Sequence, residues 1–149
     1  MLNLDPRDPA WEARVRDSFA RQPMMTTLGV ELDTVDPGVV VLAFDHDDRL
    51  TQQHGMIHGG VVGTVLDSAC GWAALTLMPT DRAVLTVEYK LNLLRPAEGA
   101  RFAGTGRLIK AGRTLSVAEG TLVEASAGGR PIATLTATLM AVEGRGIRD

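Results

Sequence analysis

The fold is decided by residues 60–77, which read GVVGTVLDSACGWAALTL and lack proline. A stretch of this length that is rich in Ala, Leu and Val and free of helix breakers predicts a helix. The apolar residues that recur on one side of it at helical spacing are Val61, Val65, Leu66, Ala69 and Ala73. A helix this apolar is expected to lie in the core rather than on the surface.

A second stripe on the same helix consists of small residues and one carboxylate. Its members are Gly60, Gly63, Thr64, Asp67, Gly71 and Ala74. Because each Gly inside a helix costs about 1 kcal/mol relative to Ala, three of them on one side predict that another backbone packs very close there, from a second helix or a sheet. Asp67 can face a groove on this side because its neighbours are small.

β-rich runs lie on both sides of this helix. Upstream, runs at about 29–35 and 38–45 flank a turn signal at 36–38, which predicts a hairpin. The four strands predicted downstream are 83–94, 101–109, 114–125 and 131–142, and the turns between them are 95–99, 110–112 and 127–129. Strands joined by short turns favour an antiparallel meander. Since one helix must cover one face of about six strands, we expect the sheet to wrap around the helix.

The two ends of the chain carry weaker signals. Asp8 can cap a helix whose first position is Pro9. The apolar residues that follow at four-residue spacing are Trp11, Val15 and Phe19. This pattern predicts a short helix within residues 1–23, ended by Pro23. Residues 143–149 are expected to form a loose tail.

The composition is that of a globular domain. The 149 residues include 15 basic and 18 acidic ones, a net charge of -3, which argues against a general nucleic-acid binder because that function needs a basic face. No apolar run reaches the roughly 18 residues of a membrane span, and the N-terminal MLNLDPRDPAWEAR lacks the apolar region of a secretory signal. We therefore expect one cytoplasmic domain over 1–149, with its core at about 24–142 and no nucleic-acid or membrane partner.

The metal-ligating residue types are sparse. Cys70 is the only cysteine, so one chain forms neither a disulfide nor a Cys-based zinc site. Within the apolar helix, Cys70 is expected to be a small buried hydrophobe. His46 and His54 are interpreted as loop residues, because the sequence has no HxxxH pair or other metal spacing. No metal is expected.

The segment before the long helix, residues 51–60, reads TQQHGMIHGG. Backbone N–H groups at a helix N-terminus are unpaired, the helix dipole adds partial positive charge, and glycines leave these groups uncovered. Such a site can hold a carbonyl oxygen that gains negative charge in a transition state. Asp67 follows His58 by nine residues, between two and three helical turns further along.

Four segments taken together resemble the hotdog-fold thioesterases of the phenylacetate-pathway (PaaI) type. They are HGG at 58–60, LDSACG at 66–71, YKLNLLRPA at 89–97 and KAGRT at 110–114. The resemblance implies an α+β hotdog fold, in which a curved antiparallel sheet encloses a long helix. It also implies hydrolysis of acyl-CoA thioesters with no cofactor beyond the CoA of the substrate. The smallest active unit would be a homodimer, often paired into a homotetramer.

The resemblance assigns catalytic roles to the matching residues. Asp67 would be the catalytic carboxylate, acting as general base on water or as nucleophile, and the Gly59 amide would polarise the thioester carbonyl. His58 would orient the loop, and a purely structural role as a cap stays open. Thr86 would help to position water across the dimer interface. Gln52 stands six residues before His58, where many members have Asn, and its longer side chain changes the geometry there.

The resemblance also assigns contacts to the substrate. The residues that would contact the nucleotide phosphates, or belong to the turn that contacts them, are Arg95, Lys110, Gly112, Arg113 and Thr114. Gln53 is the neighbouring alternative to Gln52, and Gly60 would border the same site. An ordinary solvated face is the alternative interpretation of the basic residues. The acyl group could be a small aryl or a medium-chain aliphatic one.

Two other functions stay open from the residues alone. A hydratase or dehydratase on the same fold would use a His and an acid in other positions, so the spacing of Asp67 fits it less well. A non-catalytic acyl-CoA-binding domain would retain the 110–114 turn without needing a catalytic acid, since fold does not fix function.

Overall fold

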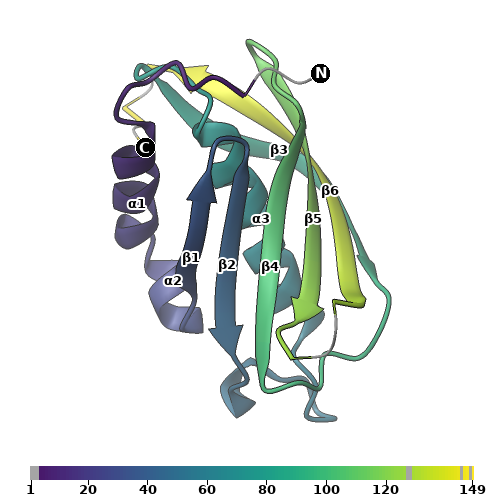
Figure 1. The fold of residues 1–149 in the computed structure, drawn as a ribbon. Helices are drawn as coiled ribbons and strands as arrows, with labels where there is room; N and C mark the ends of the chain where they lie inside the picture. Colours follow the sequence, from purple (N-terminus) through teal and green to yellow (C-terminus); the bar gives the residue numbers. More distant parts are fainter. Residues whose placement is uncertain (1–3, 127–128, 145, 148) are drawn as a thin grey trace.

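Helix α3, Gly59–Leu75, is the central element of the structure, a computed structural model that describes residues 4–126, 129–144, 146–147 and 149. A six-stranded sheet curves around it, so that the helix lies against one face (Figure 1). This confirms the expected arrangement of one long helix enclosed by one antiparallel sheet. No helix among the described residues is long and apolar enough to cross a membrane.

The sheet has one edge that the sequence did not predict. Its strands are β1 (Glu31–Asp36), β2 (Val39–Asp45), β3 (Arg82–Leu93), β4 (Arg101–Lys110), β5 (Leu115–Glu124) and β6 (Pro131–Glu143). Their order is β1-β2-β4-β5-β6-β3, and every neighbouring pair is antiparallel. The strands are confirmed, but a plain meander is wrong, because β3 pairs with β6 at the far edge.

The segment between β3 and β4 explains this order. The Ile132 carbonyl accepts hydrogen bonds from the Leu94 and Arg95 N–H groups at 2.8 and 3.1 Å, which tie the crossing segment to the start of β6. Between β2 and α3, the chain forms a short 3-10 helix, Asp48–Leu50. Ala127 and Gly128 of the predicted β5–β6 turn lie outside the described residues.

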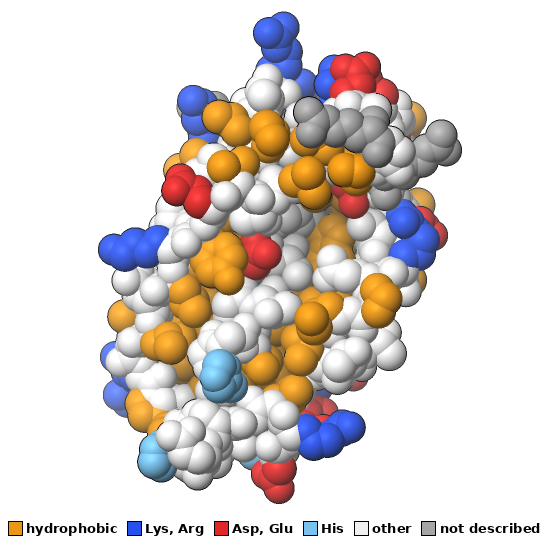
Figure 2. Space-filling model, turned by 180° about the vertical axis from the view of Figure 1, so that it is seen from behind, with side chains coloured by type: hydrophobic (Ala, Val, Ile, Leu, Met, Phe, Trp, Pro, Cys, Tyr) orange, Lys and Arg blue, Asp and Glu red, His pale blue; other side chains and the backbone are white. Residues whose placement is uncertain are grey.

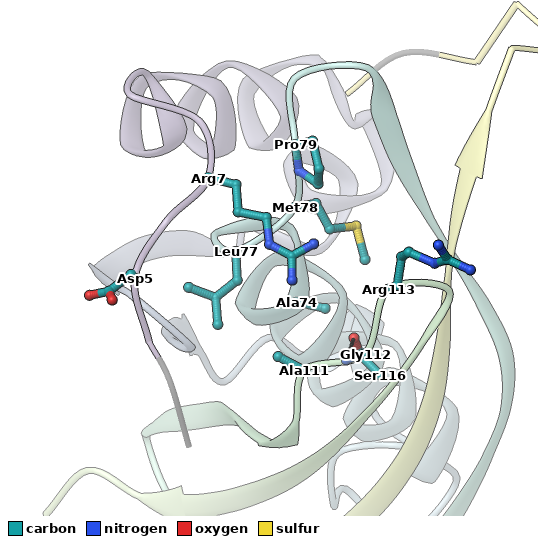
Figure 3. A pocket seen from close by; sticks show the side chains of 10 residues that line it. All are labelled: Asp5, Arg7, Ala74, Leu77, Met78, Pro79, Ala111, Gly112, Arg113 and Ser116. Carbon is teal, nitrogen blue, oxygen red and sulfur yellow. Dashed lines mark hydrogen bonds between the residues drawn. The ribbon is translucent and has the colours of Figure 1, made fainter. Parts of the chain in front are cut away.

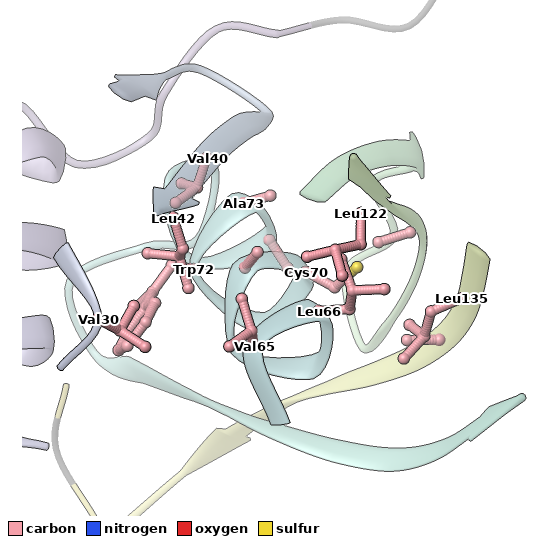
Figure 4. Packing of buried hydrophobic residues seen from close by; sticks show 14 of the residues in the cluster. Val30, Val40, Leu42, Val65, Leu66, Cys70, Trp72, Ala73, Leu122 and Leu135 are labelled. Carbon is pink, nitrogen blue, oxygen red and sulfur yellow. The ribbon is translucent and has the colours of Figure 1, made fainter. Parts of the chain in front are cut away.

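The core lies between α3 and the concave face of the sheet. In Figure 4, Val65, Leu66 and Cys70 of α3 pack among side chains from the surrounding strands, such as Leu122 and Leu135. The rings of Phe44 and Phe102 stack with their centroids 5.2 Å apart. All of these side chains are buried. With only 4% aromatic residues in the chain, most of the core is aliphatic.

The close backbone approach occurs at glycines of the strands, not at those of the helix stripe. A Cβ on Gly106 would lie 2.3 Å from the Ala69 carbonyl carbon, whereas a Cβ on Gly71 would meet nothing within 4 Å. The prediction that a backbone packs against the helical glycines is therefore wrong within one chain. Gly104 and Gly120 likewise face side chains of α3 at 3.0 and 3.3 Å. The strand glycines let the sheet close on the helix.

These two environments make a matched pair for mutation. Gly106→Ala is expected to lower the free energy of unfolding by about 3 kcal/mol, because the new methyl group meets helix backbone that cannot move alone. Gly71→Ala is expected to raise it by about 0.5–1 kcal/mol, since Ala favours the helix and no atom opposes it. Urea unfolding at one fixed protein concentration measures both. Equal effects of the two substitutions would contradict this packing.

The N-terminal segment forms two helices, α1 (Trp11–Arg21) and α2 (Pro23–Leu28). Pro23 begins α2 rather than simply ending a helix, because proline suits the first helical turn. Helix α1 starts two residues after Pro9, and the buried Asp8 accepts from the Ala10 N–H at 2.8 Å. Asp8 also pairs with Arg14 at 3.3 Å.

Asp149, in the segment expected to form a loose tail, contacts the rest of the fold. The Asp149 carboxylate accepts a hydrogen bond from the Val84 N–H at 2.6 Å and lies 3.4 Å from the Ser18 hydroxyl. Ser18 in turn accepts from the Trp72 indole N–H at 3.0 Å. The last residue therefore joins α1 to the first residues of β3, and the expectation of a loose tail is wrong at this position.

Candidate active site

A groove of about 510 Å³ opens at the N-terminal end of α3. Its lining comes from the loop before α3, the start of α3, the end of β3 with the segment after it, and β6. The lining residues are Gln52, Gln53, Met56, Ile57, His58, Gly59, Val62, Leu93, Leu94, Arg95, Pro96, Ala97 and Ile132. The loop residues are held by a tight turn, in which Gly55 has φ +83° and the Gln52 N–H donates to the Met56 carbonyl at 2.9 Å. The groove therefore brings together five of the predicted site residues: Gln52, Gln53, His58, Gly59 and Arg95.

His58 is the N-cap of α3. Its Nδ1 accepts a hydrogen bond from the Gly60 N–H at 2.9 Å, and its backbone is extended at φ -62° and ψ 136°. An imidazole that accepts through Nδ1 carries its proton on Nε2. This geometry supports the interpretation of His58 as a residue that orients the loop. It also shows that the Gly60 N–H is already used within the chain.

The Gly59 N–H is in the opposite situation. As the first N–H of the helix it has no intrahelical acceptor, and no other described residue accepts from it. Gly59 lines the groove, and a Cβ there would lie 2.7 Å from a methyl group of Leu93. An uncovered donor at the positive end of a helix can accept a carbonyl oxygen.

Asp67 lies on the same helix, half-buried, and not in the groove. The Thr86 hydroxyl donates to its Oδ1 at 2.7 Å. Burial raises the pKa of the Asp67 carboxyl above its ordinary value, and the hydrogen bond from Thr86 partly opposes this rise. Thr86 thus contacts the carboxylate of its own chain. A carboxylate with a raised pKa suits a general base.

A β-bulge in β3 changes the alternation of its side chains between the two faces of the strand. The pairing of β3 with β6 shifts between Thr86 and Glu88. A Cβ on Gly63 would lie 3.6 Å from the Tyr89 hydroxyl and 3.4 Å from Leu91. Because of the bulge, Thr86 and Tyr89 both face α3 although they are three residues apart. Sequence patterning missed Tyr89, since strict alternation would place these two side chains on opposite faces.

The outer edge of β3 is exposed and apolar. Val87 is 54% exposed and Leu93 57% exposed, and Leu85 and Tyr89 are also exposed. Seen from the side opposite to Figure 1, hydrophobic side chains gather on both sides of a hollow in the surface (Figure 2). An edge strand with unpaired backbone groups and apolar side chains is a template for pairing with another chain.

The predicted 110–114 turn lies far from the groove within one chain. Gly112 and Arg113 line a cavity of about 110 Å³ that also contacts Ala74 and Leu77, at the C-terminal end of α3 (Figure 3). A helix of 17 residues is about 25 Å long. One chain therefore does not bring this turn together with Gly59. Lys110 is exposed, as is Thr114.

The side chains of Cys70, His46 and His54 do not line the groove. Burial raises the pKa of the Cys70 thiol to about 12, which keeps it protonated and unreactive. His46 and His54 lie in or beside the loop, where a ring nitrogen of His46 is 3.1 Å from the Gly55 carbonyl. Within the described residues, no group of three or more His, Cys, Asp or Glu side chains is placed to hold a metal ion.

Comparison with known proteins gives consistent matches. A sequence model of the thioesterase superfamily matches residues 54–128. The structure resembles that of a thioesterase family protein from Silicibacter pomeroyi, with 57% identity, a TM-score of 0.87 and coverage of 90% of this chain and 99% of that one. It also resembles the PaaI protein of Escherichia coli in fold, with a TM-score of 0.82 at 16% identity, over 90% of this chain and 94% of that one. The medium/long-chain acyl-CoA thioesterase YigI of Salmonella typhimurium is 28% identical over 111 residues, which are 64% of this chain and 72% of that protein.

Proposed function

The chain belongs to the thioesterase superfamily, and from this premise we propose that it hydrolyses acyl-CoA thioesters at a site shared between two copies of the chain. The observation that carries the proposal is the pair of an unpartnered Gly59 N–H at the start of α3 and a half-buried Asp67 on the same helix. A thioester is already activated, so its hydrolysis needs a positioned base and an oxyanion site and no added cofactor.

In the proposed reaction, the Gly59 N–H donates to the thioester carbonyl oxygen. Asp67 takes a proton from water while the water oxygen bonds to the carbonyl carbon. The resulting tetrahedral intermediate carries its negative charge on the oxygen at Gly59. When the C–S bond breaks, the free acid forms and the CoA sulfur leaves with the proton that Asp67 returns. Thr86 holds the carboxylate in place through its bond of 2.7 Å.

The helix geometry supports a site made from two chains. Gly59 and Asp67 are eight residues apart, which is about 12 Å along an α-helix. Reacting groups must lie about 3 Å from one another, or be bridged by one water. Helical side chains lean toward the N-terminus, but that does not close such a gap. We therefore infer that Gly59 of one copy and Asp67 of a second copy act on the same thioester.

Two copies of the chain related by a two-fold axis would produce this arrangement. If the two α3 helices run antiparallel with Gly59 opposite the second copy's Asp67, the residue nearest the axis is the one midway between them, Gly63. The exposed edge of β3, which covers Gly63 through Tyr89, is the surface that supports pairing of the two chains. A homodimer is the proposed unit, and pairing of dimers into a tetramer stays a prediction.

The apolar lining of the groove supports binding of an apolar acyl group. Val62, Leu93 and Ile57 contribute apolar side chains, and Arg95 contributes a charged one. Arg95 also donates to the Pro131 carbonyl, so its guanidinium is held beside the groove. Gln52 accepts from the His54 N–H through its side-chain oxygen, which leaves its NH₂ group as a donor. We propose a medium-chain or small aryl acyl-CoA, the former in keeping with the name of the relative YigI.

The experiment that tests the function is a substrate panel. The purified protein is incubated with acyl-CoAs from acetyl to dodecanoyl and with phenylacetyl- and benzoyl-CoA, and released CoA is measured with a thiol reagent. We expect hydrolysis, with the highest kcat/KM for a medium-chain or small aryl group. Enoyl-CoA hydration without CoA release would indicate a hydratase instead. Binding of acyl-CoA without turnover of any substrate would indicate a binding domain.

A further inference from the structure

We propose that the cavity between the N-terminal segment and the β4–β5 turn binds a phosphate group of the coenzyme, with Arg7 and Ser116 as ligands. This inference rests on the proposed acyl-CoA substrate. It goes beyond the resemblance, which carries the 110–114 turn but says nothing of these two residues. The cavity has a volume of about 110 Å³, and Arg7, Ser116 and Arg113 are among its lining residues.

Ser116 supplies a buried donor to this cavity. Ser116 is 4% exposed, and its Oγ accepts from the Gly112 N–H at 3.3 Å. Among the described residues, no acceptor takes the proton of this hydroxyl. A buried O–H without an acceptor is costly, and a phosphate oxygen in the cavity would satisfy it.

The charges favour an anion. In Figure 3, the Arg7 guanidinium points into the space between the N-terminal segment and α3, whereas the Asp5 carboxylate points away from it. Arg113 also lines the cavity, but in Figure 3 its guanidinium points away from Arg7, so Arg7 supplies the positive charge that points into the cavity. Arg is the side chain whose planar donor fork best matches a phosphate group.

Arg7 is held in this position by contacts on both sides of it. Leu4 covers Gly38, where an added Cβ would lie 2.7 Å from a Leu4 methyl group. Asp8 is buried and paired with Arg14, whose guanidinium also donates to the Pro79 carbonyl at 2.9 Å. The backbone on either side of Arg7 is therefore anchored, which lowers the entropy lost when Arg7 binds an anion.

The cavity lies in line with Asp67. Ala74, which lines the cavity, is seven residues beyond Asp67 and thus on the same face of α3, about 10 Å further along. Between them lies Gly71, where an added Cβ would meet no atom within 4 Å. A coenzyme whose phosphate is held at Arg7 can lay its pantetheine arm along this face toward Asp67 of the same chain.

The test compares three thioesters of one acyl group: the acyl-CoA, its 3′-dephospho form and the acyl-pantetheine. Arg7→Ala is expected to raise the KM for acyl-CoA about tenfold with kcat unchanged, and Arg7→Lys to recover part of this loss. Acyl-pantetheine, which has no nucleotide phosphates, should show no penalty. If the KM increase caused by Arg7→Ala disappears with the dephospho form, Arg7 binds the 3′-phosphate. If the increase persists with the dephospho form, Arg7 binds the diphosphate.

Arg16→Ala is the matched control, because Arg16 is an exposed Arg of α1 paired with Glu12 away from the cavity. An Arg7→Ala penalty of equal size on all three thioesters, or none on acyl-CoA, would overturn the proposal. So would competition by inorganic phosphate that Arg7→Ala leaves unchanged. If no thioester is hydrolysed, calorimetric binding of CoA to the wild type and Arg7→Ala decides the cavity separately from the proposed activity.

Discussion

Asp67→Asn is expected to lower kcat for acyl-CoA hydrolysis by about 10²- to 10⁴-fold, the usual loss when a general base is removed. Asparagine has the same shape and can still accept the hydrogen bond of 2.7 Å from Thr86, so the surrounding structure should be kept. Substrate binding should change little, because the substitution removes only the group that takes the proton. Initial rates of CoA release measure kcat and KM. A KM increase with unchanged kcat would contradict the role of Asp67 as base.

The same substitution is expected to stabilise the protein at neutral pH. Burial raises the pKa of Asp67 in the folded chain, so the folded state binds this proton more tightly than the unfolded state does. The charged carboxylate therefore costs stability above the raised pKa, and this cost disappears below the ordinary pKa of aspartate. Unfolding of Asp67→Asn and the wild type should differ at pH 7 and converge in acid. Lower stability of Asp67→Asn at pH 7 would indicate a structural carboxylate instead.

The raised pKa also fixes the direction of the pH profile. A base must be ionised to act, so kcat should fall as the pH drops through the pKa of Asp67. Thr86→Val removes the hydrogen bond that holds this pKa down, and the acidic limb should then move to higher pH. A limb that moves to lower pH would contradict this assignment.

Gly59→Pro is expected to lower kcat by about 10²- to 10³-fold, the typical cost of one oxyanion donor. Proline removes the N–H itself, which Gly59→Ala would leave in place. It suits the first position of a helix, and the extended His58 backbone at ψ 136° is the conformation preferred before proline. The added Cβ would lie 2.7 Å from a methyl group of Leu93, a flexible and exposed side chain that can move aside. An unchanged thermal midpoint with full activity would exclude this amide from the reaction.

Much of the architecture follows from local patterns in the sequence. The apolar stripe on α3 and the turn residues between the strands predicted the helix, the strands and their antiparallel packing. The loop and helix start at 51–60 predicted a site for a carbonyl oxygen, because unpaired amides and glycines coincide there, and the groove opens at this position. These features depend on residues close together in the chain, which is why patterning detects them.

The rest depends on contacts between distant residues. The position of β3 beside β6 is fixed by the crossing segment after β3, which no periodicity records. The close approach at Gly106 depends on which strand lies over Ala69, and the stripe on α3 pointed to the wrong glycines. The inward side chain of Tyr89 depends on a bulge. The eight-residue spacing of Gly59 and Asp67 already implies that one helix holds them about 12 Å apart. The proposal of a site shared between two chains also required the groove at Gly59 and the exposed edge of β3, which only the structure shows.

The measurement that tests the shared site most directly is the activity of mixed dimers of Asp67→Asn and Gly59→Pro. Copies with two different affinity tags are co-expressed, and the mixed dimer is purified by both tags in turn. In the proposed arrangement, one of its two sites combines an intact Gly59 with an intact Asp67, so about half of the wild-type activity is expected. A mixed dimer no more active than either variant alone would show that each site lies within one chain and would contradict the account.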